Sequence, residues 1–310
     1  MTMRDAAAAA EPPRRVLASA ERESLASPGL YARAWRVFRR DRVAMFGLSL
    51  LIVIVAFSLA SPLVARYTGF TYYENHLSDK LSAPGENGYV LGSDANGRDI
   101  LTRLAYAGRV SLLVGLCAAV AEIMIGLALG LVAGYYEGMT DSIIMRLVEI
   151  FICLPIMPLL LLITSFYEPS LLPLALIIGA LSWPGDARLL RGEVLAMRGR
   201  EYIEGARVIG APARVIMLRH VLPNITPILI ILVTFTVSST IFIETFLSFL
   251  GLGVQVPTPS WGNMMNDAQR FYRTNWTAVF FPGLMVYLTC LALYLVGSGL
   301  RDALDPKLLD

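Results

Sequence analysis

Six long apolar runs limit what this chain can fold into more than any other feature of its sequence. The runs cover residues 43–65, 110–134, 143–166, 170–190, 224–250 and 277–299. Each is close to the roughly 20 residues that an α-helix needs to cross the hydrocarbon core of a bilayer. Hydrophobic residues make up 56% of the chain and charged residues 16%, whereas soluble domains hold about 25% charged residues. The sequence therefore predicts an all-α integral membrane protein with six spans in residues 43–300.

Proline and glycine interrupt two of these runs. Leu154-Pro155 and Pro158 lie in the third run, and Pro184-Gly185 follow Trp183 near the end of the fourth. Proline removes a backbone hydrogen bond and its ring clashes with the preceding turn, so both helices should kink or unwind. A membrane tolerates such broken helices only where they face protein or a water-filled path. Pro155 and Trp183 are therefore candidates for lining a translocation path or gate.

The second run carries a stripe of small residues. Gly126, Gly130 and Gly134 are spaced four residues apart, so they lie on one face of a helix. Small residues at this spacing let two helix backbones approach closely in lipid, where packing drives helix association. We expect this stripe to serve helix packing rather than a pore.

Lysine and arginine residues divide unevenly between the two sides of the predicted spans. Of the 26 such residues, 19 lie on the side of the N-terminal tail and the 186–220 loop, and seven lie on the opposite side. By the positive-inside rule, both termini and that loop face the cytoplasm. The terminal and loop segments are then a largely disordered cytoplasmic tail (1–42), an extracytoplasmic loop (66–107), a cytoplasmic loop (186–223), an outer segment (251–274) and a cytoplasmic C-terminal tail (301–310).

Both outer segments contain amphipathic pieces. Ile100, Leu104 and Ala107 recur at helical spacing within residues 99–110, which predicts a helix lying along the outer membrane surface. A second piece follows two glycines and two prolines and begins at Trp261. Trp261 is a candidate for the gate region, and ordinary interfacial anchoring of its ring is an equally good interpretation.

Three acidic residues, Glu122, Glu149 and Glu244, lie in or near the predicted spans, where a lone charge costs about 2.5–3.5 kcal/mol or more. Each should face the bundle interior, water or a partner. Glu149 can pair with Arg146, three positions earlier on the same helix. Glu244 follows the polar run 238–240 and is the better candidate for lining the path or contacting a partner. A proton relay is less favoured, because each helix holds one such acidic residue and Glu244 has no titratable neighbour close in sequence.

The residue patterns of an enzyme are missing. Neither Lys80 nor Lys307, the two lysines, follows a GxxxxG pattern, which excludes a P-loop. His76 and His220 are the two histidines, and neither HExxH nor GxSxG occurs. No CxxC pair occurs among the three cysteines, which lie in apolar runs: Cys117, Cys153 and Cys290. We therefore expect no catalytic residue, metal site or cofactor. An intramembrane enzyme would need a nucleophile and a base, and the sequence shows no such pair.

A polar segment, residues 198–223, separates the fourth and fifth runs. Its first half predicts a short amphipathic helix, Ile203–Ile209, with Glu201 and Glu204 on the polar face. Gly210 should end this helix, because glycine enters the left-handed conformation without a Cβ clash. The segment is therefore a small helix between membrane spans rather than a span.

This segment closely resembles the EAA loop of ABC importer permeases, whose pattern is EAA, three residues, G, nine residues, I, any residue, LP. Gly205 stands for the middle alanine and His220 for the isoleucine, and the spacing is intact. The resemblance extends through LGSDANGRDILTRLAYAGRVSLLVG, LSWPGDARLLRGEVL, ETFLSFLGLGVQVPTPSWGNMM and GLRDALDP, within Leu91–Pro306. Together these segments look like the C-type permease subunit of dipeptide and oligopeptide importers.

The resemblance implies a fold and a set of roles. The fold would be a six-span type I ABC importer permease bundle, with a cytoplasmic coupling helix docked in a groove of an ATPase. The residues implied in ATPase coupling are Glu201, Glu204, Gly205, Ala206, Gly210, Leu222 and Pro223. The candidates for the translocation path or gate are Glu244, Pro155, Trp183 and Trp261.

The resemblance also implies partners and a location. The partners would be a homologous B-type permease subunit, two ATP-binding subunits or domains, an extracytoplasmic peptide-binding protein and membrane lipid, with no nucleic acid. The chain would be a non-catalytic, multi-pass protein of the bacterial cytoplasmic (inner) membrane, with ATP hydrolysed by its partners.

Two alternatives remain at this stage. The same role could serve nickel chelates or glutathione, because selectivity in the family rests largely in the binding protein. A secondary transporter should show an internal repeat with paired broken helices in matching halves. The breaks here lie in the third and fourth runs and do not form such a pair.

Overall fold

The computed structural model describes residues 30–167 and 170–304, and every regular element in these ranges is a helix. The long helices are α3 (Arg42–Leu59), α5 (Ile100–Tyr136), α12 (Leu222–Phe249) and α14 (Thr277–Leu304). The shorter ones are α2 (Leu30–Arg40), α4 (Ser61–Thr68), α6 (Gly138–Cys153), α7 (Ile156–Phe166), α8 (Leu171–Ser182), α9 (Pro184–Arg198), α10 (Glu201–Val208), α11 (Ala213–Val215) and α13 (Trp261–Ala268). Single turns of other helix types cover Leu77–Asp79, Ile216–Val221 and Gln269–Phe271.

The predicted count of six spans is not confirmed. Within the described residues, four helices are long and apolar enough to cross a membrane, or five if the bent pair α6–α7 is one span. The fourth predicted run is divided, because α8 has 12 residues and stops at Ser182 before Pro184 begins α9. The breaks themselves lie where the prolines predict them, and α6 and α7 meet at Leu154-Pro155 with a bend of 80°.

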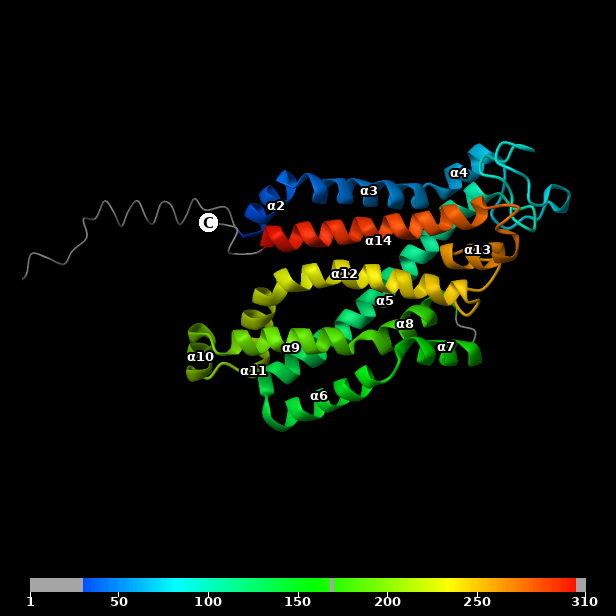
Figure 1. The fold of residues 1–310 in the computed structure, drawn as a ribbon. Helices are drawn as coiled ribbons and strands as arrows, with labels where there is room; N and C mark the ends of the chain where they lie inside the picture. Colours follow the sequence, from blue (N-terminus) through cyan, green and yellow to red (C-terminus); the bar gives the residue numbers. More distant parts are fainter. Residues whose placement is uncertain (1–29, 168–169, 305–310) are drawn as a thin grey trace, which may run out of the picture.

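Helix α5 is the centre of the bundle, and it contacts α3, α6, α8, α9 and α12 (Figure 1). Its glycine stripe lies against α9. A Cβ placed on Gly130 would be 2.7 Å from the carbonyl oxygen of Ala187, and one on Gly134 would be 2.7 Å from Cβ of Val194. Any side chain larger than hydrogen would push the two helices apart, so the packing role predicted for this stripe is confirmed.

The helix predicted along the outer membrane surface is instead the first part of α5. Asp99 caps α5 by accepting a hydrogen bond from the Thr102 backbone N–H at 2.8 Å, and the helix then runs without a break to Tyr136. Ile100 and Leu104 are buried against α13 and α14. The segment is helical, as its amphipathic pattern predicts, but its apolar face packs on protein rather than on lipid. At 1.5 Å per residue, the 37 residues of α5 extend about 55 Å, longer than a bilayer core.

Part of the predicted N-terminal tail is helical. Residues 30–40 form α2, while residues 1–29 lie outside the described residues. Ala34 and Phe38 are buried in a cluster with Ala44, Val296 and Leu304, so α2 packs on α3 and α14. Tertiary contacts with distant helices stabilise this short helix, which the sequence places in a largely disordered tail. At the other terminus α14 continues to Leu304, so the first residues of the predicted C-terminal tail are helical too.

The two ends of the bundle differ (Figure 1). Helix α2, the last turn of α14 and α10 lie at one end, and the loop after α4 lies with α13 at the opposite end. The N-terminal helix, the C-terminal helix end and the polar segment therefore share one side of the molecule.

Four charged side chains hold the loop between α4 and α5 to the rest of the bundle. Arg98 pairs with Asp94 at 2.6 Å and with Asp267 of α13 at 2.9 Å. Arg103 of α5 is 1% exposed as a side chain, lies 3.5 and 3.6 Å from the same two carboxylates, and donates a hydrogen bond to the Tyr72 carbonyl oxygen at 3.2 Å. This charged cluster, Asp94, Arg98, Arg103 and Asp267, joins the long loop to both α5 and α13.

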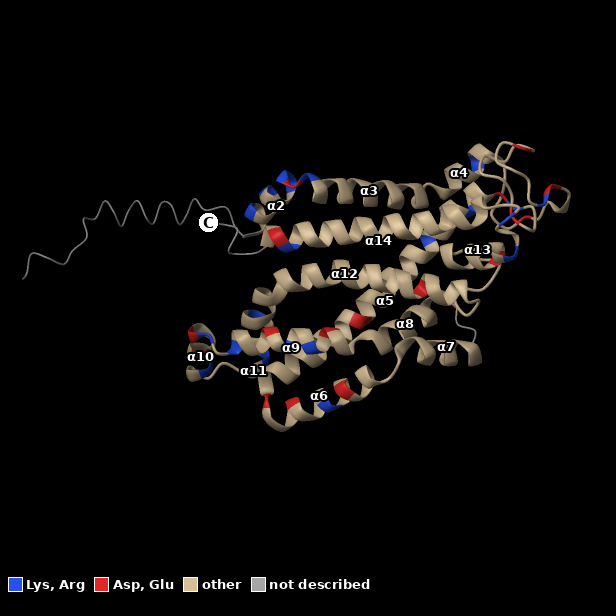
Figure 2. Ribbon diagram, viewed as in Figure 1, with Lys and Arg blue, Asp and Glu red and all other residues tan. Residues whose placement is uncertain are grey.

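The sides of the bundle differ in charge (Figure 2). Between Val43 and Leu59 of α3, and between Thr277 and Leu300 of α14, there is no charged residue. Large apolar side chains such as Phe46, Val53 and Tyr287 are exposed there. In contrast, charged residues occur along α6 and α9 on the other side. The α3–α14 side is suited to lipid, and the α6–α9 side is not.

Candidate functional site

Helix α10 extends beyond the bundle at the end that carries α2 (Figure 1). Arg200 is its N-cap, and it runs for eight residues to Val208. Only Ile203 and Ala206 are buried, packing into a cluster with Leu190, Val194 and Ile216. Ile203 and Ala206 are the buried contacts of this helix, and its other side chains are exposed. The predicted amphipathic helix is confirmed, and it ends one residue earlier than predicted.

Gly210 ends the helix as the sequence predicts. Its φ is +81°, in the left-handed region, and its N–H donates a hydrogen bond to the Arg207 carbonyl oxygen at 3.0 Å. The Ala211 N–H donates to the Ala206 carbonyl oxygen at 3.1 Å, which completes a Schellman motif. A Cβ on Gly210 would meet nothing within 4 Å, so the backbone conformation alone favours glycine here.

The tip of α10 exposes both charge and apolar surface. Glu201, Glu204 and Gly205 are exposed on the helix. Val208 and Ile209 are 86% and 85% exposed, more than any other large hydrophobic residue among the described ones. They lie at a charged end of the molecule beyond the apolar bundle, so lipid does not account for their exposure. We call Glu201, Glu204, Gly205, Val208 and Ile209 the α10 tip.

The base of α10 is joined to the corner between α5 and α6 by contacts that sequence reasoning missed. Arg198, at the end of α9, pairs with Glu137. Arg191 donates to both carboxylate oxygens of Asp141 at 2.5 Å, and this hydrogen bonding raises the pKa of the Arg191 guanidinium above its ordinary value. The Arg207 guanidinium lies 5.7 Å from the centre of the Tyr135 ring. Partners 50 or more residues apart leave no local pattern that would reveal them.

Leu222 and Pro223 are not part of the α10 tip. They begin α12, directly after a π-helical turn from Ile216 to Val221. Leu222 packs beside the cluster that holds Ile203, and Pro223 is exposed at the first turn of α12. The structure therefore brings five of the seven predicted coupling residues onto α10 and its C-terminal turn, and places these two at the junction with the next long helix.

The four path or gate candidates lie in different environments. Glu244 is 0% exposed and accepts a hydrogen bond from the Ser248 hydroxyl at 2.7 Å. Trp261 is also 0% exposed and donates from its indole nitrogen to the Leu104 carbonyl oxygen at 3.2 Å. Trp183 is buried against Phe151, and only Pro155, at the α6–α7 bend, is exposed. Three of the four candidates thus lie inside this subunit rather than on a surface of it.

The three acidic residues predicted in the spans also differ in their burial. Glu122 is buried on α5, and one of its oxygens has no hydrogen-bond partner, as is also true of Asp186 on α9. Glu149 is exposed on α6 and pairs with Arg146 at 3.0 Å, which confirms the predicted local pair. Glu122 and Glu244 face the bundle interior, and Glu149 faces outward.

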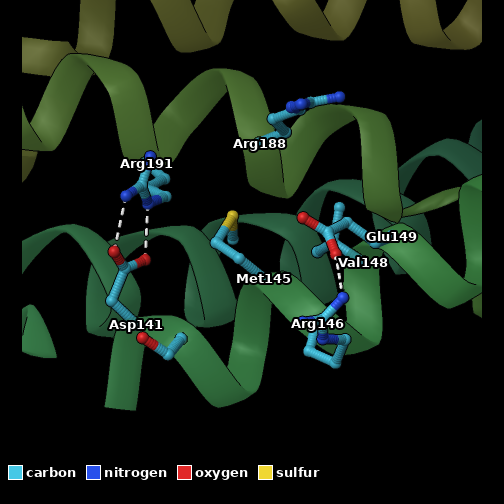
Figure 3. Close-up of a pocket in the computed structure, with 8 residues that line it drawn as sticks. Asp141, Met145, Arg146, Val148, Glu149, Arg188 and Arg191 are labelled. Carbon is cyan, nitrogen blue, oxygen red and sulfur yellow. Dashed lines mark hydrogen bonds and ion pairs between the residues drawn. The ribbon is translucent and has the colours of Figure 1, made fainter. Parts of the chain in front are cut away.

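A pocket of about 360 Å³ lies between α6 and α9 (Figure 3). Three arginines line it, Arg146, Arg188 and Arg191, together with the acidic residues Asp141 and Glu149. Among residues 30–167 and 170–304, no group of three or more His, Cys, Asp or Glu side chains could hold a metal ion.

Comparison with known proteins defines the class to which this helical bundle belongs. Residues 126–310 match the family described as the binding-protein-dependent transport system inner membrane component, and residues 29–84 match the N-terminal TM domain of oligopeptide transport permease C. The chain belongs to this family of inner membrane transport components. The resemblance found in the EAA-like segment and its neighbours is therefore confirmed.

Individual relatives cover nearly the whole chain. It is 36% identical to the oligopeptide transport system permease protein OppC of Haemophilus influenzae, over 93% of this chain and 92% of that protein. It is 38% identical to the di/tripeptide transport system permease protein DppC of Pseudomonas aeruginosa, over 94% and 97%. The dipeptide transport system permease protein DppC of Bacillus subtilis is 36% identical, over 93% and 90%.

Proposed function

We propose that this chain is one permease subunit of an ATP-driven importer of dipeptides or oligopeptides. The names of the relatives support the peptide substrate class. The partners in this proposal are a homologous B-type permease, two ATP-binding subunits or domains and an extracytoplasmic peptide-binding protein. The bundle end with α2 and α10 faces the cytoplasm of a bacterial cell, as the excess of arginine and lysine on that side favours.

The α10 tip carries the proposal. Val208 and Ile209 present apolar surface to water beside two carboxylates, on a helix of which only two residues are buried. Exposed apolar groups that lie outside the bilayer and are rimmed by polar ones favour a protein partner. We assign the tip to a groove of the ATP-binding subunit, where Glu204 and Gly205 face the partner and Gly210 sets the angle of the helix.

The base of α10 gives this docking a mechanical consequence. Arg191–Asp141 and Arg198–Glu137 connect α9, which leads into α10, to the start of α6. A displacement of α10 by the ATP-binding subunits would therefore move α9 and α6 together rather than bend a loop. The 80° bend at Leu154-Pro155 is the place where α6 can swing relative to α7. ATP binding would in this way switch the permease pair between two packed arrangements.

The experiment that tests this function measures ATP hydrolysis. The purified chain should hydrolyse no ATP, because it has no phosphate-binding loop. Hydrolysis should appear when the ATP-binding subunits and the partner permease are added, and peptide-loaded binding protein should raise it several-fold. Hydrolysis by the chain alone, surviving complete removal of partners, would contradict the assignment.

A further inference from the structure

The pocket between α6 and α9 lies on the side of the bundle that is unsuited to lipid. The Arg146 and Glu149 side chains are 77% and 55% exposed on α6, which also carries Asp141 in its first turn. Charged side chains in membrane segments face protein or a water-filled cavity almost without exception. Because these exposed groups are charged, we expect this face of α6 to meet the translocation path, the partner permease or cytoplasmic water rather than lipid.

The charges in the pocket do not balance. Asp141 uses both carboxylate oxygens on Arg191, and Glu149 pairs with Arg146. Arg188 is exposed and pairs with no carboxylate in the described part of the chain. Figure 3 shows its side chain on α9, apart from both ion pairs. The pocket thus holds one guanidinium more than its carboxylates neutralise, and that guanidinium is available to an anion.

The chemistry of the free group fits a carboxylate. An arginine presents a planar fork of N–H donors that binds both oxygens of a carboxylate at once. Met145, partly exposed between the two ion pairs, supplies an apolar surface suited to a short side chain next to that carboxylate. The volume of about 360 Å³ lies within the usual range of small-ligand sites, roughly 300–1,000 Å³.

We propose that Arg188 binds the C-terminal carboxylate of a peptide while the peptide crosses the permease. This inference rests on the proposed peptide substrate and adds a contact for it on the permease subunit itself. Because Arg188 is on α9, the helix that leads directly into α10, a bound peptide would contact the same rigid unit that the ATP-binding subunits move.

The test uses the complete transporter in nanodiscs without its binding protein. Cys117, Cys153 and Cys290 are replaced by serine, and Ser142, an exposed residue of the pocket, is replaced by cysteine. The reaction rate of this cysteine with N-ethylmaleimide is measured with excess trialanine and with excess trialanine amide, which lacks the carboxylate. Trialanine should slow the reaction at least threefold and the amide should not. Arg188→Gln should abolish the protection, and Arg188→Lys should keep part of it.

Several results would overturn the inference. Equal protection by both peptides, or protection that persists in Arg188→Gln, would show that Arg188 does not bind the carboxylate of the peptide. Loss of the partner permease from the purified Arg188→Gln transporter would assign the arginine to the subunit interface instead. Arg270→Gln, which removes an exposed arginine near α13, controls for the change in charge. It should leave both the assembly and the protection unchanged.

The outcome also separates this inference from the proposed function. If the wild-type transporter with its binding protein takes up trialanine but trialanine gives no protection, the Arg188 assignment fails and the peptide importer stands. If neither uptake nor protection occurs with any peptide while ATP hydrolysis by the assembled subunits is intact, the peptide substrate fails together with the assignment.

Discussion

Replacement of Gly210 by valine should reduce transport at least tenfold while leaving the protein inserted and assembled with its partner permease. The left-handed conformation of this residue, with φ of +81°, disfavours any residue with a Cβ by about 1–2 kcal/mol, and a β-branched one most of all. No atom lies within 4 Å of the new Cβ, so the change strains the turn without a steric clash in the bundle. The helix should leave its docking angle, and uptake of labelled peptide into vesicles measures the loss.

Gly199→Val is the matched control. Gly199 lies at the other end of the same loop, with φ of −79° and nothing within 4 Å of a Cβ, so a side chain fits there without strain. Arg198 would not serve as a control, because it pairs with Glu137.

Glu204→Lys should reproduce the effect of Gly210→Val by reversing a charge on the α10 tip, with the ATP-binding subunits either released or hydrolysing ATP without uptake. Wild-type transport by both variants would show that α10 is not a coupling element.

Replacement of Arg103 by methionine should destabilise the folded chain by about 3–5 kcal/mol, the usual penalty for breaking a buried ion pair. Arg103 is 1% exposed as a side chain and lies between the carboxylates of Asp94 and Asp267. Its removal leaves these groups with Arg98 alone and takes away the hydrogen bond to the Tyr72 carbonyl. The loop between α4 and α5 should detach from α13, which thermal unfolding in detergent and protease sensitivity of that loop both measure.

Arg109→Met supplies the comparison on the same helix. Arg109 is exposed and makes one long hydrogen bond, 3.4 Å to the Ser61 hydroxyl. Its replacement should change stability by less than about 1 kcal/mol, as is usual for an exposed charge. Similar melting temperatures for the two variants would mean that the charged cluster does not hold the loop end together.

Local patterns in the sequence predicted the parts of the site that depend on local structure. Helical spacing and a glycine stop were enough for α10 and its turn at Gly210, and the prolines located the bend at Leu154-Pro155. The pairing of Arg146 with Glu149 is likewise a neighbour contact on one helix. Each of these features is decided within about four residues, where backbone preference and side-chain spacing dominate.

Features that depend on distant partners were missed or misplaced. The start of α5 looked like a surface helix, because no local signal shows that α13 and α14 cover its apolar face. The preceding polar run makes Glu244 a candidate for lining the path and Trp261 is a candidate for the gate region, and no local signal shows that both are buried in the subunit, with hydrogen bonds from Ser248 and to Leu104. The Arg191–Asp141 pair joins residues 50 apart in the sequence, and only the packing of α6 against α9 brings them together.

Site-specific photocrosslinking from the α10 tip tests the central claim most directly. A photoreactive amino acid at Ile209, which is 85% exposed and makes no core contact, should leave folding and assembly intact. The same amino acid at Tyr287, exposed on the α14 side, supplies the reference position. In the assembled transporter, Ile209 should crosslink to the ATP-binding subunit and Tyr287 should not. Absence of that adduct from Ile209, in a transporter that still takes up peptide, would contradict the assignment of α10 as the coupling helix.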